Sequence, residues 1–94
     1  MPEKLGQSQL EAALIHLQNW TLENGELTQS ITFPDFVQAI EFVNKVATLA
    51  EEAGHHPDID IRYNRVRLAL VTHDAGGITA KDTQLASSIN QARM

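Results

Sequence analysis

The chain has 94 residues and no cysteine, an absence that excludes several kinds of site at once. Disulfide scaffolds, thiolate zinc sites, iron–sulfur clusters and cysteine nucleophiles all require the missing residue. No run of about 18 apolar residues occurs, so no membrane-spanning helix is expected. The first residues, MPEKLGQSQLEAAL, lack the basic segment and apolar stretch of a signal peptide. We therefore expect a soluble, cytoplasmic protein with no membrane partner.

Positive charge is also scarce. Seven Lys and Arg residues stand against twelve Asp and Glu residues, and the formal net charge is −5 at pH 7. A non-specific nucleic-acid binder needs a basic stripe, so direct contact with nucleic acid is not expected. Hydrophobic residues make up 43% and charged residues 20%, the balance of an ordinary globular domain. The length fits one domain over residues 1–94, small enough that self-association would help to stabilise it.

The spacing of apolar residues in the first half predicts a helix, a hairpin and a second helix. A short amphipathic helix is expected over residues 8–17. Asn24-Gly25 is a favoured pair for a two-residue type I′ turn, which would set Leu22 opposite Leu27. A long helix should then begin with Pro34 in its first turn and end at Gly54. We expect its apolar stripe to comprise Phe36, Val37, Ile40, Val43, Val46, Ala47 and Ala50.

The second half predicts another hairpin and a last helix. Apolar and polar residues alternate over residues 59–70, and a turn at Asn64-Arg65 matches apolar with apolar at every step. Thr79 and Asp82 have the spacing of a capping box that opens the last helix. Both hairpins have one apolar face. We therefore expect a two-layer α+β fold, in which three helices cover one face of a four-stranded antiparallel sheet, in the order α-β-β-α-β-β-α.

Three histidines lie near the second hairpin, and the predicted register relates two of them. His55 and His56 stand at its entrance and His73 at its exit. If the pairing continues outward, His56 faces His73 on one side of the sheet, with Cβ atoms about 4.5–5.5 Å apart. Pro57 cannot donate to the ladder, so the pairing would loosen at that point. We expect the three imidazoles to face one cavity.

Imidazole suits proton transfer because its ordinary pKa of about 6.5 lies near neutral pH. Two close imidazoles oppose each other's protonation, which favours a state with one acid and one base. Nearby acidic residues would favour the protonated partner: Glu51, Asp74 and Asp82.

Two other interpretations stay open from the residues alone. The histidines are equally suited to be exposed polar residues at the ends of elements, and Asp82 is first of all a helix-capping residue. Three histidines with Asp or Glu are also plausible zinc ligands. Simultaneous coordination by His55 and His56 is awkward, however, because neighbouring side chains of a strand diverge.

The signature region of the pterin-4a-carbinolamine dehydratases is similar to the stretch EEAGHHPDIDIRYNRVRLALVTHDAGGITAKD. The length and the predicted order of elements also agree, so the resemblance covers nearly the whole chain. The residues at the family's spacings are Glu51, His55, His56, Pro57, Tyr63, His73 and Asp82.

The resemblance implies a hydro-lyase that removes water from 4a-hydroxytetrahydropterin and gives quinonoid dihydropterin, which recycles the cofactor of aromatic amino-acid hydroxylases. His55, His56 and His73 then match the catalytic histidines. The remaining matches surround the pterin site: Pro57, Thr72, Asp74, Ala75 and Asp82. An acid at the hydroxyl and a base at N5 suffice, so no metal or other cofactor is implied. Our hypothesis is that His73 and His55 exchange these roles with substrate stereochemistry, while His56 orients the pterin.

The resemblance also implies that the chain binds other protein chains, including further copies of itself. A homodimer or homotetramer is expected, with sheets joined edge to edge and long helices packed together. Some animal members of the family bind a homeodomain transcription factor, so a non-catalytic role in dimerisation or transcription is the alternative function. That alternative leaves the complete set of histidines unexplained.

Overall fold

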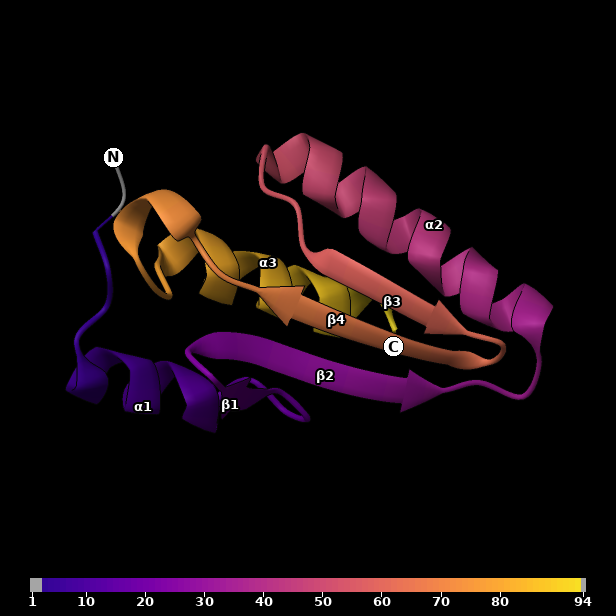
Figure 1. The fold of residues 1–94 in the computed structure, drawn as a ribbon, viewed down its shortest axis with the longest axis horizontal. Coiled ribbons are helices and arrows are strands. Elements are labelled where there is room, and N and C mark those ends of the chain that lie inside the picture. The colour runs from indigo at the N-terminus through magenta and orange to yellow at the C-terminus, as the bar shows by residue number, and fades with distance from the viewer. Residues whose placement is uncertain (1–2, 94) are drawn as a thin grey trace.

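A computed structural model, which describes residues 3–93, has three α-helices, four strands and one 3-10 turn. In chain order these are α1 (Gln7–Ile15), β1 (Thr21–Glu23), β2 (Glu26–Thr32), α2 (Phe36–Ala53), β3 (Asp58–Arg62), β4 (Arg65–Leu70), η1 (His73–Ala75) and α3 (Ala80–Ala92). Figure 1 shows this arrangement with the longest axis of the molecule horizontal. The predicted order of helices and strands is confirmed, while the short turn η1 was not predicted.

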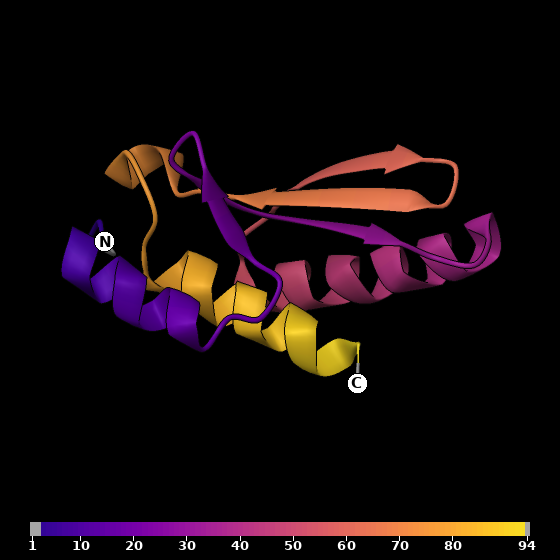
Figure 2. The same cartoon turned by 90° about the horizontal axis from the view of Figure 1, so that it is seen from below.

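The four strands form one antiparallel sheet in the spatial order β1-β2-β4-β3. Figure 2 shows α1, α2 and α3 on the same face of this sheet. The opposite face carries polar side chains, since each strand alternates between the two sides. The predicted α+β fold of two layers is therefore confirmed.

The first hairpin has the predicted turn and register. Asn24 and Gly25 both have positive φ, at 51° and 79°, as a type I′ turn requires. Leu22 pairs with Leu27, and Thr21 with Thr28.

The predicted register of the second hairpin is wrong by two residues. Ile61 pairs with Val66, and Arg62 with Arg65, so the turn lies at Tyr63-Asn64 rather than Asn64-Arg65. A shift of two residues keeps every side chain on its face, so the apolar pattern cannot distinguish the two registers. Contacts outside the hairpin favour the observed one. The Asn64 side-chain amide donates to the Phe33 carbonyl at 2.7 Å, and the Phe33 N–H donates to the Asn64 carbonyl at 2.8 Å.

Helix α2 begins and ends at residues with clear capping roles. The Asp35 carboxylate accepts a hydrogen bond from the Gln38 N–H at 2.8 Å, so Asp35 is the N-cap. Pro34 therefore precedes the cap. The prediction that Pro34 lies in the first turn of the helix is wrong. Gly54 ends the helix in the left-handed conformation at φ 63°, as predicted.

The buried face of α2 differs in part from the predicted stripe. Its buried residues are Ala39, Phe42, Val46 and Ala50. Phe36, Val37 and Ala47, which the prediction placed in the stripe, are exposed instead. The helix carries more apolar residues than one face can hold, and only the packing of α2 on the sheet decides which of them are covered.

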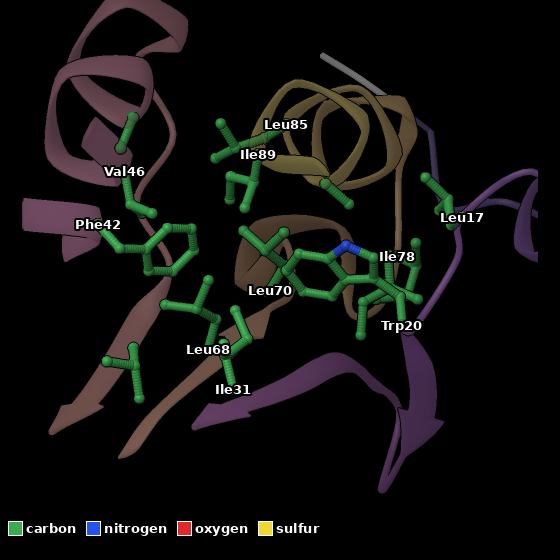
Figure 3. Close-up of a cluster of buried hydrophobic side chains, with 14 of the residues drawn as sticks. Leu17, Trp20, Ile31, Phe42, Val46, Leu68, Leu70, Ile78, Leu85 and Ile89 are labelled. Carbon is green, nitrogen blue, oxygen red and sulfur yellow. The ribbon is translucent and has the colours of Figure 1, made fainter. Parts of the chain in front are cut away.

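The core lies between the sheet and the helices. Figure 3 shows Phe42 of α2 and Trp20, which precedes β1, on opposite sides of Leu70 in β4. Ala50 near the end of α2 and Leu85 near the start of α3 both belong to this buried cluster. The buried residues of this cluster are Leu17, Trp20, Leu27, Ile31, Ala39, Phe42, Val46, Ala50, Val66, Leu68, Leu70, Ile78, Leu85, Ala86 and Ile89.

Among residues 3–93, no helix is long and apolar enough to cross a bilayer.

Candidate active site

The candidate site lies where the end of α2, the loop after β4 and the start of α3 meet. His55 follows Gly54, the residue that turns the chain out of α2, and its N–H donates to the Ala50 carbonyl at 3.1 Å. This bond fixes the direction in which the chain leaves the helix. The His55 side chain consequently points toward the first turn of α3.

His55 is held by a buried carboxylate. Its Nε2 lies 2.5 Å from Oδ1 of Asp82, and the two side chains are 12% and 0% exposed. The carboxylate of Asp82 can only accept, so the ring nitrogen is the donor in this bond. A short hydrogen bond between a charged carboxylate and an imidazole is the arrangement that orients a histidine for proton transfer.

The other oxygen of Asp82 is also fully engaged. Oδ2 accepts hydrogen bonds from the Thr72 hydroxyl at 2.7 Å and from the Thr79 N–H at 2.9 Å. Asp82 is therefore the helix-capping residue that the sequence predicted, and it binds His55 at the same time. Three donors from separate parts of the chain fix the carboxylate in one orientation.

His56 also meets a carboxylate, but at the surface. Its Nε2 lies 2.5 Å from Oε2 of Glu51, and the two side chains are 62% and 77% exposed. Glu51 makes no other side-chain hydrogen bond within the described part of the chain. The pair is thus open to water on most sides.

His73 does not pair with His56 as the sequence predicted. Strand β3 begins only at Asp58 and β4 ends at Leu70, so the ladder stops before it reaches either histidine. The chain instead turns back on itself, with a bridge between Thr72 and Gly77, and His73 opens η1 as an exposed residue. The prediction of a cross-strand histidine pair is wrong, because it extended a shifted register beyond the end of the sheet.

The remaining predicted residues lie beside these groups. Thr72 directly precedes His73 and contacts Asp82, so the loop that carries His73 is tied to the carboxylate that holds His55. Pro57 is half-buried at the entrance to β3, Asp74 is exposed, and Ala75 is half-buried in η1. Within residues 3–93, no three His, Asp or Glu side chains are grouped closely enough to hold a metal ion.

Two participants were not recognised as site residues from the sequence. Thr79 is fully buried, and its hydroxyl lies 2.8 Å from that of Thr72. Glu51 is predicted as an acidic neighbour and matches the family's spacing, but its direct contact with His56 is not predicted. The capping-box spacing did point to Thr79, but as a helix start, and only the packing of α3 against the loop reveals its second contact.

Comparison with known proteins gives a consistent result. The family model for pterin 4 alpha carbinolamine dehydratase matches residues 3–92. A curated protein from Acidobacterium capsulatum, provisionally named as such a dehydratase, is 62% identical over 80 residues, which cover 85% of this chain and 87% of the relative. A protein from Chloroflexus aurantiacus with the same provisional name is 53% identical over 88 residues, covering 94% of this chain and 95% of the relative.

Two solved structures are similar to this one. A crystal structure from Brucella melitensis, described as a transcriptional coactivator/pterin dehydratase, has a TM-score of 0.90 and 34% identity, and covers 95% of this chain and 97% of that one. A pterin dehydratase-like protein described as a RuBisCO assembly factor in the alpha-carboxysome has a TM-score of 0.67, covering 81% of this chain and 90% of that one. At 23% identity, the second likeness concerns the fold alone.

Proposed function

This chain belongs to the pterin-4a-carbinolamine dehydratase family, and from that premise we propose that it dehydrates 4a-hydroxytetrahydropterins to quinonoid dihydropterins. The family match covers residues 3–92, so the proposal concerns nearly the whole chain. The names of the relatives support a hydro-lyase, and the side chains described above supply the groups that such a reaction needs.

The hydrogen bond between His55 and the buried carboxylate of Asp82 is the observation that carries the proposal. An imidazole oriented in this way can take up a proton and keep the resulting charge beside a carboxylate. An incidental surface histidine would not need a partner that is itself buried and held by two further donors. The arrangement is therefore the one expected for a proton-transfer residue.

The reaction needs one proton added and one removed. The C4a–O bond breaks as the hydroxyl is protonated and leaves as water, while loss of the N5 proton lets the N5 electrons form the new C=N bond. Atoms and electrons balance, and neither a metal nor a redox cofactor enters these steps. General acid–base assistance of this kind is typically worth about 10²–10⁴-fold.

His55 and His73 are the two proton-transfer residues in this proposal, and they exchange acid and base roles with the stereochemistry at C4a. His56, beside Glu51 at the surface, orients the pterin. Thr72 joins the loop of His73 to Asp82, so one carboxylate helps to position both catalytic segments. Pro57, Asp74 and Ala75 border the place where the pterin would bind.

Stopped-flow absorbance of freshly generated 4a-hydroxytetrahydropterin tests the proposal directly. The wild-type protein should accelerate dehydration, and the double variant His55→Ala/His73→Ala should leave only the uncatalysed rate. His16→Ala is the matched control, because His16 is an exposed histidine at the end of α1. If the double variant keeps the wild-type rate, the assignment of these two residues is wrong.

We also propose that the chain forms homo-oligomers. Strand β3 lies at an edge of the sheet, and its exposed side chains include Ile59 and Ile61. A free strand edge readily pairs with another copy. Light scattering after size exclusion should give a dimer or tetramer mass. Ile61→Lys should lower that mass if β3 forms the contact, and Val37→Glu should lower it if the exposed face of α2 does.

A second candidate function, binding of a partner protein, is favoured by the exposed apolar residues Phe36 and Val37 on α2. The Brucella melitensis protein is described as a coactivator as well as a dehydratase. In a two-component binding assay, this function would be supported by a partner that still binds the His55→Ala variant but no longer binds the Val37→Glu variant. Such a role would be independent of the histidines.

A further inference from the structure

We propose that Thr79, which lies behind the site, is a positioning residue that works through Thr72 and Asp82 to hold the ring of His55 in place. This inference deepens the proposed function and rests on it for its catalytic consequence. The geometry on which it stands, however, concerns the ring of His55 alone and can be measured without substrate.

The direction of each hydrogen bond in the chain follows from simple counting. The Thr72 hydroxyl has a single hydrogen, and it must point to Oδ2 of Asp82 at 2.7 Å, because the carboxylate can only accept. In the 2.8 Å contact between the two hydroxyls, Thr79 is therefore the donor and Thr72 the acceptor. The Thr79 oxygen in turn accepts the Lys81 N–H at 3.2 Å.

The two threonines thus form a one-way relay toward the carboxylate. Thr79 also donates its backbone N–H to the same oxygen of Asp82 at 2.9 Å. Because two donors occupy Oδ2, Oδ1 is left to accept the hydrogen bond from Nε2 of His55 at 2.5 Å. Rotation of the carboxylate would break the hydrogen bonds that Asp82 accepts, and Asp82 is fully buried, so water is not available to replace them.

The consequence for His55 is a defined tautomer. Because Nε2 donates to Asp82, the neutral ring carries its proton there and leaves Nδ1 as the basic atom. Nδ1 has no hydrogen-bond partner among the described residues. Every buried side-chain nitrogen or oxygen among these residues does have a partner. Nδ1 is therefore not buried, and solvent can reach it. The geometry therefore assigns Nδ1 of His55 as the atom that exchanges a proton with the pterin.

Long-range proton–nitrogen NMR spectra of the ring, recorded at a pH where His55 is neutral, test the assignment. The wild type should show the tautomer with the proton on Nε2, and Thr79→Ser, which keeps the hydroxyl, should show the same. Thr79→Val keeps the shape of the side chain but removes the donor. Asp82 can still only accept, so the tautomer should stay the same, but the resonance of the Nε2 proton should move upfield because the weakened relay loosens the hydrogen bond to Asp82.

The kinetic expectation for Thr79→Val is a fall in kcat of about five- to tenfold with KM little changed, the effect of one lost hydrogen bond. Thr79→Ser should restore the rate. Loss of the helix cap alone is controlled by Asp35→Ala, which removes the equivalent cap bond of α2 at the end of that helix distant from His55. This variant should lose stability without any change in the resonance of the His55 Nε2 proton.

Thr72→Val provides a second variant in case Thr79→Val does not fold, since Thr72 is only half-buried and lies outside a helix. A wild-type resonance of the Nε2 proton in both valine variants would overturn the inference, and so would Nδ1 protonation in the wild type. If the resonance of the Nε2 proton moves as expected but no variant or wild-type protein dehydrates the pterin, the proposed function fails while the assignment of the ring stands. If the protein dehydrates the pterin but the resonance of the Nε2 proton is unchanged in the valine variants, only the role of Thr79 is rejected.

Discussion

Two adjacent histidines meet carboxylates at the same distance, and their surroundings make them different. Nε2 of His55 lies 2.5 Å from Asp82, and Nε2 of His56 lies 2.5 Å from Glu51. The first carboxylate is fully buried and receives two further hydrogen bonds, whereas the second is 77% exposed. Distance alone would rank the two pairs as equal.

What separates the pairs is the number of other contacts that would have to break with them. In water, an ion pair gains little because solvent screens it and both side chains are mobile. In a buried network, the loss of one partner leaves donors and acceptors without any replacement. We therefore expect function and stability to depend strongly on His55 and Asp82, and only weakly on the contact between His56 and Glu51.

The largest difference should appear when each histidine is removed in turn. His55→Ala should lower kcat for dehydration by about 10²–10⁴-fold, because a proton-transfer group is lost. His56→Ala should lower it by no more than about tenfold, the effect of one lost hydrogen bond to the pterin. Stopped-flow measurement of both variants beside His16→Ala would show this order. Equal losses would mean that the buried partner of His55 has no catalytic value.

Removal of the buried charge should have the next largest effect. In Asp82→Asn an amide group faces donors on both sides, so at least one buried donor loses its acceptor. The free energy of unfolding should fall by about 1–3 kcal/mol, which urea denaturation would measure. Asp35→Asn is a matched control, since Asn caps a helix about as well as Asp and should leave stability unchanged. An equal loss in both variants would contradict the special role of the network.

The same contrast explains how much of the fold could be predicted from the sequence. The turn at Asn24-Gly25 could be predicted because the positive φ of both residues is a local requirement of this turn type. The second hairpin was misplaced because a two-residue shift leaves the apolar faces unchanged, and the deciding contact, between Asn64 and Phe33, joins it to another strand. Likewise, no local pattern shows which apolar residues of α2 are covered.

For the candidate site, neighbours in the sequence were easier to identify than neighbours in space. His55 and His56 stand together in the chain, and the spacing from Thr79 to Asp82 indicated a helix cap. The contact from Asp82 to His55 depends on the packing of α3 against the end of α2, which composition and periodicity do not contain. The resemblance to a known family named the residues, but their partners in space came from the structure.

A smaller effect is expected from the exposed carboxylate. Glu51→Gln removes the charge beside His56 but keeps the size of the side chain, so the midpoint of urea denaturation should not change measurably. The dehydration rate should change by no more than about threefold, since solvent can hydrate an exposed imidazole in place of the carboxylate. A loss as large as that of Asp82→Asn would show that Glu51 acts on the substrate itself.

The smallest effect, and the most direct test of the comparison, is the response of the two pairs to salt. Between about 0.1 M and 1 M salt, the screening length falls from about 10 Å to 3 Å, which weakens exposed pairs far more than buried ones. In wild-type protein, the ring-nitrogen shifts of His56 should move toward those of Glu51→Gln as salt rises. Those of His55 should stay constant, because its carboxylate is shielded from the ions and held by the Thr72 hydroxyl. If both rings respond alike, burial does not distinguish the two pairs in solution.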